Sequence, residues 1–179
     1  MHDDICRIIY TAEEIEQAVK DLGRRISADY SDKNLFMISV LKGSVIFMSD
    51  LMRAITIPCT IDFLAVSSYG AGTDTTGEVR ILKDLDGPLQ DRDLLVVEDI
   101  LDSGVTLAYL LELLTARHPR SIRVCTLFDK YERRKVDIKP EYIGLRVPNE
   151  FIVGYGLDYA EKYRNIPYIG VLKPEIYSD

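Results

Sequence analysis

The feature that most limits the possible folds is a short apolar run followed at once by acids and a glycine turn. Residues 94–97 read LLVV, and three carboxylates follow at Glu98, Asp99 and Asp102. Such a run is typical of a strand buried on both faces of a parallel sheet. Residues 102–118, DSGVTLAYLLELLTARH, predict a helix directly after it. This strand–turn–helix unit indicates an α/β fold, in which ligands bind at the carboxyl ends of the strands.

The rest of the chain repeats this alternation. Thr11 and Glu14 form a capping-box pattern ahead of a helix expected over residues 12–30, and a second helix is expected over residues 44–56. A mainly parallel, twisted sheet flanked by helices follows from this order. The strands are expected at residues 35–41, 59–69, 78–85, 94–100, 122–129, 142–148, 151–157 and 168–173.

Composition excludes several classes of protein. The length of 179 residues fits a single domain, 1–179. A net charge of −7 argues against nucleic-acid binding through bulk charge. No signal peptide is recognised and no apolar run reaches the roughly 18 residues of a membrane span, so we expect no membrane partner. Three scattered cysteines without a CxxC pattern indicate reduced thiols and a cytoplasmic location. With only two histidines, a Ser-His-Asp hydrolase or a His-ligated metal centre is not expected.

Two turns have the composition of anion-binding sites. Residues 103–106, SGVT, open a helix, so free backbone N–H groups, the helix dipole and two hydroxyls face the same point. Beside the three acids, this turn suits a sugar phosphate, with its hydroxyls or a magnesium ion on the acids. Residues 42–44, KGS, follow another buried strand and indicate a second such turn. The alternative interpretation is that Asp102 only caps the helix and that the other acids form a solvated rim.

Gly154 and Gly156 do not complete a dinucleotide-binding fingerprint, and indicate a close backbone approach within a strand instead.

Several motifs of the chain resemble those of a known family. LLVVEDILDSGVTL, residues 94–107, resembles the phosphoribosyl-pyrophosphate signature of type I phosphoribosyltransferases. The resemblance to the hypoxanthine-guanine branch runs from about residue 8 to residue 177, and the segments that carry it are LKGS (41–44), VSSYG (66–70), LFDK (127–130) and FIVGYGLDYAEKYRNIPYIGVLKPEIY (151–177). It implies the type I phosphoribosyltransferase fold, with a core at about 30–150 and a small hood formed from the terminal segments. It also implies transfer of 5-phosphoribosyl from phosphoribosyl pyrophosphate to hypoxanthine or guanine, giving IMP or GMP and pyrophosphate, with Mg2+.

The resemblance assigns a role to each matching residue. Asp102 matches the general base that manages the proton on N7 of the purine. The residues that match the site of the ribose and its 5′-phosphate are Glu98, Asp99, Asp102, Ser103, Gly104, Val105 and Thr106. The acids that match the metal site are Glu98, Asp99 and Asp158. The residues that match the pyrophosphate site are Lys42, Gly43 and Arg164.

The base and the lid are assigned in the same way. Lys130 matches the lysine that donates to purine O6, and Ser68 and Tyr69 match the start of a mobile lid. The other residues that match the purine site are Phe151, Ile152 and Asp158. Many relatives have valine where Ile152 stands, and glycine or alanine where Ser44 stands. The family often has a cis peptide at the position of Leu41–Lys42.

Other activities stay open at this stage. A xanthine- or adenine-preferring transferase is one, although Lys130 argues against adenine, whose 6-amino group accepts poorly. A nucleotide-sensing, RNA-binding regulator on the same fold is another. The short basic run RRK at residues 133–135 is interpreted as a solvated loop rather than an RNA contact. A binding module that has lost catalysis is disfavoured by the intact Asp102, Lys42 and Arg164. The family forms dimers and tetramers, so we expect a homodimer or homotetramer.

Overall fold

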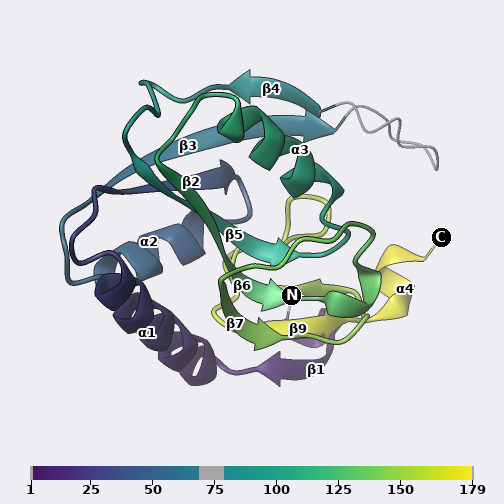
Figure 1. Cartoon of the computed structure of the whole chain (residues 1–179). Helices are drawn as coiled ribbons and strands as arrows, with labels where there is room; N and C mark the ends of the chain where they lie inside the picture. Colours follow the sequence, from purple (N-terminus) through teal and green to yellow (C-terminus); the bar gives the residue numbers. More distant parts are fainter. Residues whose placement is uncertain (1, 69–78, 179) are drawn as a thin grey trace.

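The computed structural model describes residues 2–68 and 79–178, and its centre is a six-stranded sheet (Figure 1). The strand order is β4-β3-β2-β5-β6-β7, and all neighbours are parallel except β4, which pairs antiparallel with β3. This confirms the mainly parallel sheet. The strands are β2 (Leu35–Leu41), β3 (Cys59–Ser68), β4 (Val79–Lys83), β5 (Asp93–Leu101), β6 (Ser121–Asp129) and β7 (Tyr142–Arg146).

Helices cover both faces of this sheet, as Figure 1 shows. They are α1 (Ala12–Asp29) and α2 (Val45–Ala54) on one face and α3 (Val105–Thr115) on the other. Successive side chains of a strand point to opposite faces. On β5, Leu95 and Val97 therefore pack in the core with α1 and α2, while Leu94 and Val96 pack with α3. This two-sided burial explains why the strand is apolar without a break.

The terminal segments form a second, three-stranded antiparallel sheet, which we call the hood. It consists of β1 (Ile5–Tyr10), β9 (Ile169–Leu172) and β8 (Ile152–Val153), in the order β1-β9-β8. Three short helical segments complete the fold: η1 (His2–Asp4), η2 (Tyr131–Arg133) and α4 (Pro174–Tyr177). The hood was expected from the family resemblance, although the strand at residues 5–10 was not predicted.

The structure corrects two of the expected elements. Only residues 152–153 of the strand expected at 151–157 are extended, because Gly154, Tyr155 and Gly156 all have positive φ and form a turn. The helix expected at 102–118 begins at Val105 and ends at Thr115. Its N-cap residue is Gly104, so the interpretation of Asp102 as a helix cap is wrong.

Candidate active site

A cavity of about 710 Å³ opens where three parallel strands end. Lys42, Asp102 and Lys130 line it, and each is the first residue after β2, β5 or β6. This is where a parallel α/β sheet is expected to bind a ligand. The predicted site residues that line the cavity are Lys42, Gly43, Asp99, Asp102, Lys130, Phe151, Ile152, Asp158 and Arg164.

Two half-buried acids lie near the end of β5. Burial raises the pKa of Asp99 to about 6, and burial together with the neighbouring Asp99 charge raises the pKa of Glu98 well above its usual range. Asp99 lies beneath the turn that carries Lys42, because a Cβ on Gly43 would come within 1.9 Å of Asp99 Oδ2. A side chain at residue 43 would therefore displace the carboxylate. A bound cation would favour the ionised form of both acids.

We expect Asp99→Asn to stabilise the protein above about pH 6. The folded-state pKa, about 6, is higher than the ordinary 3.8, so between these values the folded state binds more protons than the unfolded state. Stability therefore falls as pH rises through this window and stays reduced above it. Asparagine avoids this loss and keeps an oxygen that can accept from Ile100 N, as Asp99 Oδ1 does at 2.8 Å. We expect a gain of about 1–3 kcal/mol above this window.

Urea unfolding over a range of pH, in the presence of a chelator, measures this effect. The difference between Asp99→Asn and the unaltered protein should disappear below about pH 3, where the Asp99 carboxyl is protonated in both the folded and the unfolded state. Asp137→Asn is the control, because this side chain is 85% exposed. A difference that does not vary with pH would contradict the assigned cause.

Asp102 presents an unsatisfied acceptor. Its Oδ1 is buried and accepts no hydrogen bond from the residues that the structure describes, although Arg133 Nε lies 3.2 Å away. The ion pair with Arg133 supplies opposite charge but no hydrogen bond, so this oxygen can still accept one from a ligand N–H. Arg133 belongs to the run RRK, for which a solvated loop was expected. That interpretation is wrong for Arg134, which forms an ion pair with the buried Asp129.

The turn of residues 103–106 has the backbone geometry of an anion-binding site. Gly104 has φ +80°, a conformation that other residues adopt only with strain. The loop after η2 packs closely on it: a Cβ on Gly104 would lie 2.7 Å from Val136 Cγ2, and Lys135 N donates to Ser103 O at 2.9 Å. This packing holds the start of α3 directly after β5. There Val105 N donates to Ser103 Oγ at 3.4 Å, and the first bond within the helix is Ala108 N to Gly104 O.

Lys130 is buried, with only 5% of its surface exposed. Burial lowers the pKa of its ammonium group, and the nearby Asp102 carboxylate partly opposes that shift. Nζ donates to Glu150 O at 3.0 Å, the single hydrogen bond it makes to the described residues. An ammonium group has three protons, so two are left for a ligand in the cavity.

Phe151 and Ile152 form the hood side of the cavity. Ile152 is buried and pairs with Val171 in the sheet, whereas Phe151 is 39% exposed. Tyr177 stacks on Phe151, with ring centroids 4.8 Å apart at 21°, and Tyr159 meets the Phe151 ring edge-on at 5.6 Å. These two tyrosines support Phe151, and sequence reasoning missed them because no local pattern signals the contact.

The two basic residues of the expected pyrophosphate site share one carboxylate. Glu161 Oε2 lies 3.2 Å from Lys42 Nζ and 3.3 Å from Arg164 Nη2, and these contacts lower the pKa of Glu161. Arg164 Nη2 also lies 2.9 Å from Asp158 Oδ1. Glu161 was not identified from the sequence. Its carboxylate bridges two cations that are close enough to bind one anion together.

The turn of residues 42–44 is held together by the side chain of Ser44. Its Oγ bonds to Val40 O and to Ser39 Oγ, so a serine at this position closes the turn from within. The expected cis peptide at Leu41–Lys42 is present.

The remaining predicted residues do not line the cavity or lie outside the described part of the chain. Glu98 precedes the lining residue Asp99 in sequence, and residues 103–106 follow the lining residue Asp102. Ser68 is the last residue of β3, and Tyr69 lies outside the described residues.

The three acids expected to bind metal do not form a closed metal cage. Within residues 2–68 and 79–178, no group of three or more His, Cys, Asp or Glu side chains is arranged to hold a metal ion. Mg2+ commonly takes only one or two protein carboxylates, and substrate phosphates and water complete its shell. The half-buried acids of β5 and Asp158 fit that mode of binding.

Comparison with known proteins agrees with this geometry. The family model described as phosphoribosyl transferase domain matches residues 7–160. The chain is 50% identical over 179 residues to the hypoxanthine-guanine phosphoribosyltransferase of Staphylococcus aureus strain Mu50, and covers 100% of both chains. A crystal structure of a hypoxanthine phosphoribosyltransferase from S. aureus superposes with a TM-score of 0.97 at 50% identity, over 100% of this chain and 97% of that one.

A further relative is a larger protein. The bifunctional protein TilS/HprT of Listeria monocytogenes is 49% identical over the whole of this chain, which spans 28% of the length of that relative. The family model covers the residues that line the cavity from Lys42 to Asp158. The chain therefore belongs to the phosphoribosyl transferase family.

Proposed function

We propose that this protein transfers 5-phosphoribosyl from phosphoribosyl pyrophosphate to N9 of hypoxanthine or guanine, forming IMP or GMP and pyrophosphate in purine salvage. One observation carries the proposal. The 710 Å³ cavity brings together a buried lysine, an aspartate oxygen that accepts no hydrogen bond from the described residues, and two cations bridged by one carboxylate. Names of relatives at 50% identity over the whole chain support the same activity.

The base end suits a 6-oxopurine. Lys130 offers ammonium protons to the exocyclic O6, an acceptor that adenine lacks. Asp102 Oδ1 accepts the N–H at N7, and takes that proton as N9 bonds to the ribose. The exposed part of Phe151 offers an aromatic surface for the ring.

The phosphate end suits a leaving pyrophosphate. Lys42 and Arg164 neutralise charge that develops on the departing oxygens. Glu161 must give up its contacts with both cations when pyrophosphate takes its place, and its carboxylate keeps the cations paired in the free protein. The turn of residues 103–106 binds the 5′-phosphate through its N–H groups and hydroxyls.

Magnesium is the cofactor we propose, held by Glu98, Asp99 and Asp158 together with substrate oxygens. A bound Mg2+ supplies positive charge that stabilises the leaving group. Burial raises the pKa of Asp99 and Glu98 despite the hydrogen bond that Asp99 accepts from Ile100 N, and a cation beside them would favour their ionised forms.

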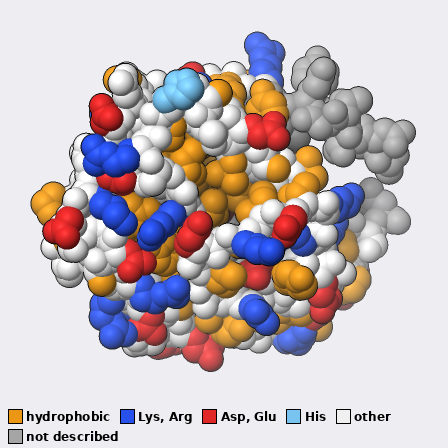
Figure 2. Space-filling view, viewed as in Figure 1, with side chains coloured by type: hydrophobic (Ala, Val, Ile, Leu, Met, Phe, Trp, Pro, Cys, Tyr) orange, Lys and Arg blue, Asp and Glu red, His pale blue; other side chains and the backbone are white. Residues whose placement is uncertain are grey.

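We propose a cytoplasmic homodimer or homotetramer as the working form. The free state of Cys6, Cys59 and Cys125 supports a reducing compartment. Among the described helices, none is both long and apolar enough to cross a membrane. On the face in Figure 2, Lys and Arg side chains alternate with Asp and Glu around a hollowed hydrophobic centre, rather than forming one basic surface.

A panel of bases tests the proposal. With phosphoribosyl pyrophosphate and Mg2+, hypoxanthine and guanine should give nucleotide, followed by ultraviolet absorbance, whereas adenine and uracil should not. Xanthine is included because Lys130 also suits its O6. Turnover of adenine in preference to hypoxanthine would contradict the role of Lys130. Nucleotide binding without turnover of any base, together with retention on RNA at physiological salt, would favour the regulator instead.

A further inference from the structure

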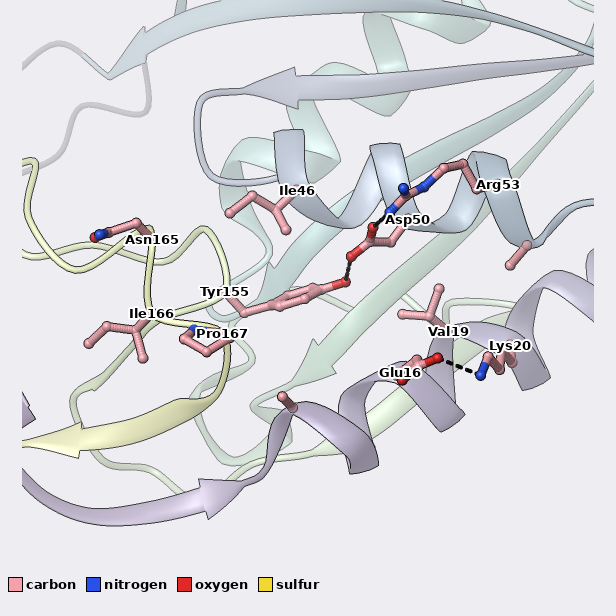
Figure 3. Close-up of a pocket in the computed structure, with 12 residues that line it drawn as sticks. Glu16, Val19, Lys20, Ile46, Asp50, Arg53, Tyr155, Asn165, Ile166 and Pro167 are labelled. Atoms are coloured by element: carbon pink, nitrogen blue, oxygen red, sulfur yellow. Dashed lines mark hydrogen bonds and ion pairs between the residues drawn. The ribbon is translucent and has the colours of Figure 1, made fainter.

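A second cavity, of about 720 Å³, lies outside the active site, between α1, α2 and residues 155 and 165–167 (Figure 3). One of its walls contains a hydrogen bond between two elements that are far apart in sequence. Tyr155 Oη donates to Asp50 Oδ2 at 2.5 Å, and Asp50 also pairs with Arg53. Tyr155 is 7% exposed, and its ring meets Phe128 edge-on at 6.4 Å. The bond thus joins α2 to the turn of residues 154–157 through a charged, half-buried acceptor.

On the Asp50 side, the hydrogen bond fixes α2, the helix that begins directly after the turn of residues 42–44. α2 continues directly from Lys42–Ser44: Val45 N donates to Lys42 O at 3.2 Å, and Met48 N donates to Ser44 O at 2.8 Å. A rigid helix transmits a shift at Asp50 to the turn at its own N-terminus. The placement of Lys42 and Gly43 therefore depends on where α2 is held.

At the Tyr155 end, the bond fixes a turn that holds the second basic residue. Gly156 N donates to Arg164 O at 3.0 Å, and Arg164 Nη1 donates to Gly156 O at 2.8 Å. The same turn lies against the first one, because a Cβ on Gly156 would be 2.1 Å from Gly43 O. Tyr155 N also donates to Ile166 O at 2.7 Å. The turn of residues 154–157 thus contacts both halves of the pyrophosphate site.

We propose that the Asp50–Tyr155 hydrogen bond positions the pyrophosphate site, by fixing the distance between the Gly43 turn and Arg164. The proposal rests on the proposed function, since it concerns the site of the same reaction. Neither side chain lines the active-site cavity, so both are positioning residues rather than catalytic ones. Pyrophosphate spans two phosphates, and its binding requires the two parts of the site to keep their spacing.

Tyr155→Phe is the direct test, because it removes only the hydroxyl and leaves the ring against Phe128. The KM for phosphoribosyl pyrophosphate should rise about 3–10-fold. This is less than the full effect of losing a charge-assisted hydrogen bond, because the bond acts on the site indirectly. The KM for hypoxanthine should stay within about twofold, since the hydroxyl bonds to Asp50 and the ring that packs on Phe128 is kept. Titration calorimetry with inorganic pyrophosphate and Mg2+ should show a weakening of the same size.

Three further variants make the test specific. Tyr10→Phe removes a hydroxyl that donates to Arg146 O at 2.8 Å and so joins β1 to β7, which contain neither turn. This change should alter neither KM. Asp50→Asn keeps an acceptor, so the KM for phosphoribosyl pyrophosphate should rise only slightly. Asp50→Leu removes the acceptor and should raise this KM as much as Tyr155→Phe does. Combining Asp50→Leu with Tyr155→Phe should add little, because both changes remove one interaction.

Thermal unfolding confirms that each variant is folded before its kinetics are compared. An unchanged KM for phosphoribosyl pyrophosphate in folded Tyr155→Phe, or an equal rise for both substrates, overturns the proposal. These results leave the proposed function intact if the unaltered protein converts hypoxanthine to IMP. If the unaltered protein converts no base, the proposed function fails first, and pyrophosphate calorimetry still decides whether the bond positions the site.

Discussion

Asp102→Asn should lower the turnover of hypoxanthine by about 10²–10⁴-fold, the usual contribution of a positioned general base. The structure gives the reason. Asp102 Oδ1 is buried without a hydrogen bond to the described residues, so in the complex it is available to the purine N–H. Asparagine has almost the same shape and can accept a hydrogen bond, but it cannot take the proton. Steady-state rates with saturating substrates measure the loss.

Two comparisons make this result interpretable. Asp137→Asn, at a side chain that is 85% exposed, should turn over at the normal rate. The affinity of Asp102→Asn for phosphoribosyl pyrophosphate should stay within a few-fold, because the anion-binding turn uses backbone groups. An unchanged turnover number would remove Asp102 from the role of base.

Lys130→Met should lower kcat/KM for hypoxanthine by about 10–150-fold, the range expected for loss of a hydrogen bond from a charged donor. Methionine fills a similar volume, so the buried site stays packed while the donor to O6 is lost. The KM for phosphoribosyl pyrophosphate should change little, because β5 separates β6, which Lys130 follows, from β2, which Lys42 follows. The base panel repeated on this variant should also show weaker discrimination between hypoxanthine and adenine.

The control for this change is Lys139→Met, at a lysine that is 85% exposed. It should leave both kinetic constants and the base preference unaltered. If Lys130→Met weakens binding of both substrates equally, Lys130 supports the cavity as a whole and does not select the base.

Local signals in the sequence predicted the elements whose contacts are local. The capping box at the start of α1 is present, with Thr11 N donating to Glu14 Oε2 and Glu14 N donating to Thr11 Oγ1. The strand β5, its acids and the glycine turn before α3 were predicted for the same reason, since each has a pattern within a few residues. The phosphate-binding turn could therefore be proposed from physical chemistry alone.

Features that depend on distant contacts could not be predicted in this way. β1 was missed because it is stabilised by pairing with β9, at the other end of the chain. The prediction of a strand at 151–157 was wrong. The segment is apolar like a strand, but three consecutive residues in it have positive φ angles. The close approach indicated by the glycines is real, but it occurs in a turn against Gly43. The contact of Arg133 with Asp102 and that of Glu161 with Lys42 were missed because these partners lie far apart in sequence. The roles of Lys130 and Arg164 came from the family resemblance.

The pairing of β1 with β9 has a consequence for synthesis of the protein. All six strands of the central sheet precede residue 147, so this sheet can pair without the residues that follow it. β1 must wait for β9, and Lys173 N bonds to Asp4 O only when nearly the whole chain has emerged. Contacts between such distant residues form slowly. Phe151 and Ile152 on the hood and Arg164 beyond them are thus the last residues to join the cavity, so both ends of the proposed site are completed only after the central sheet has formed.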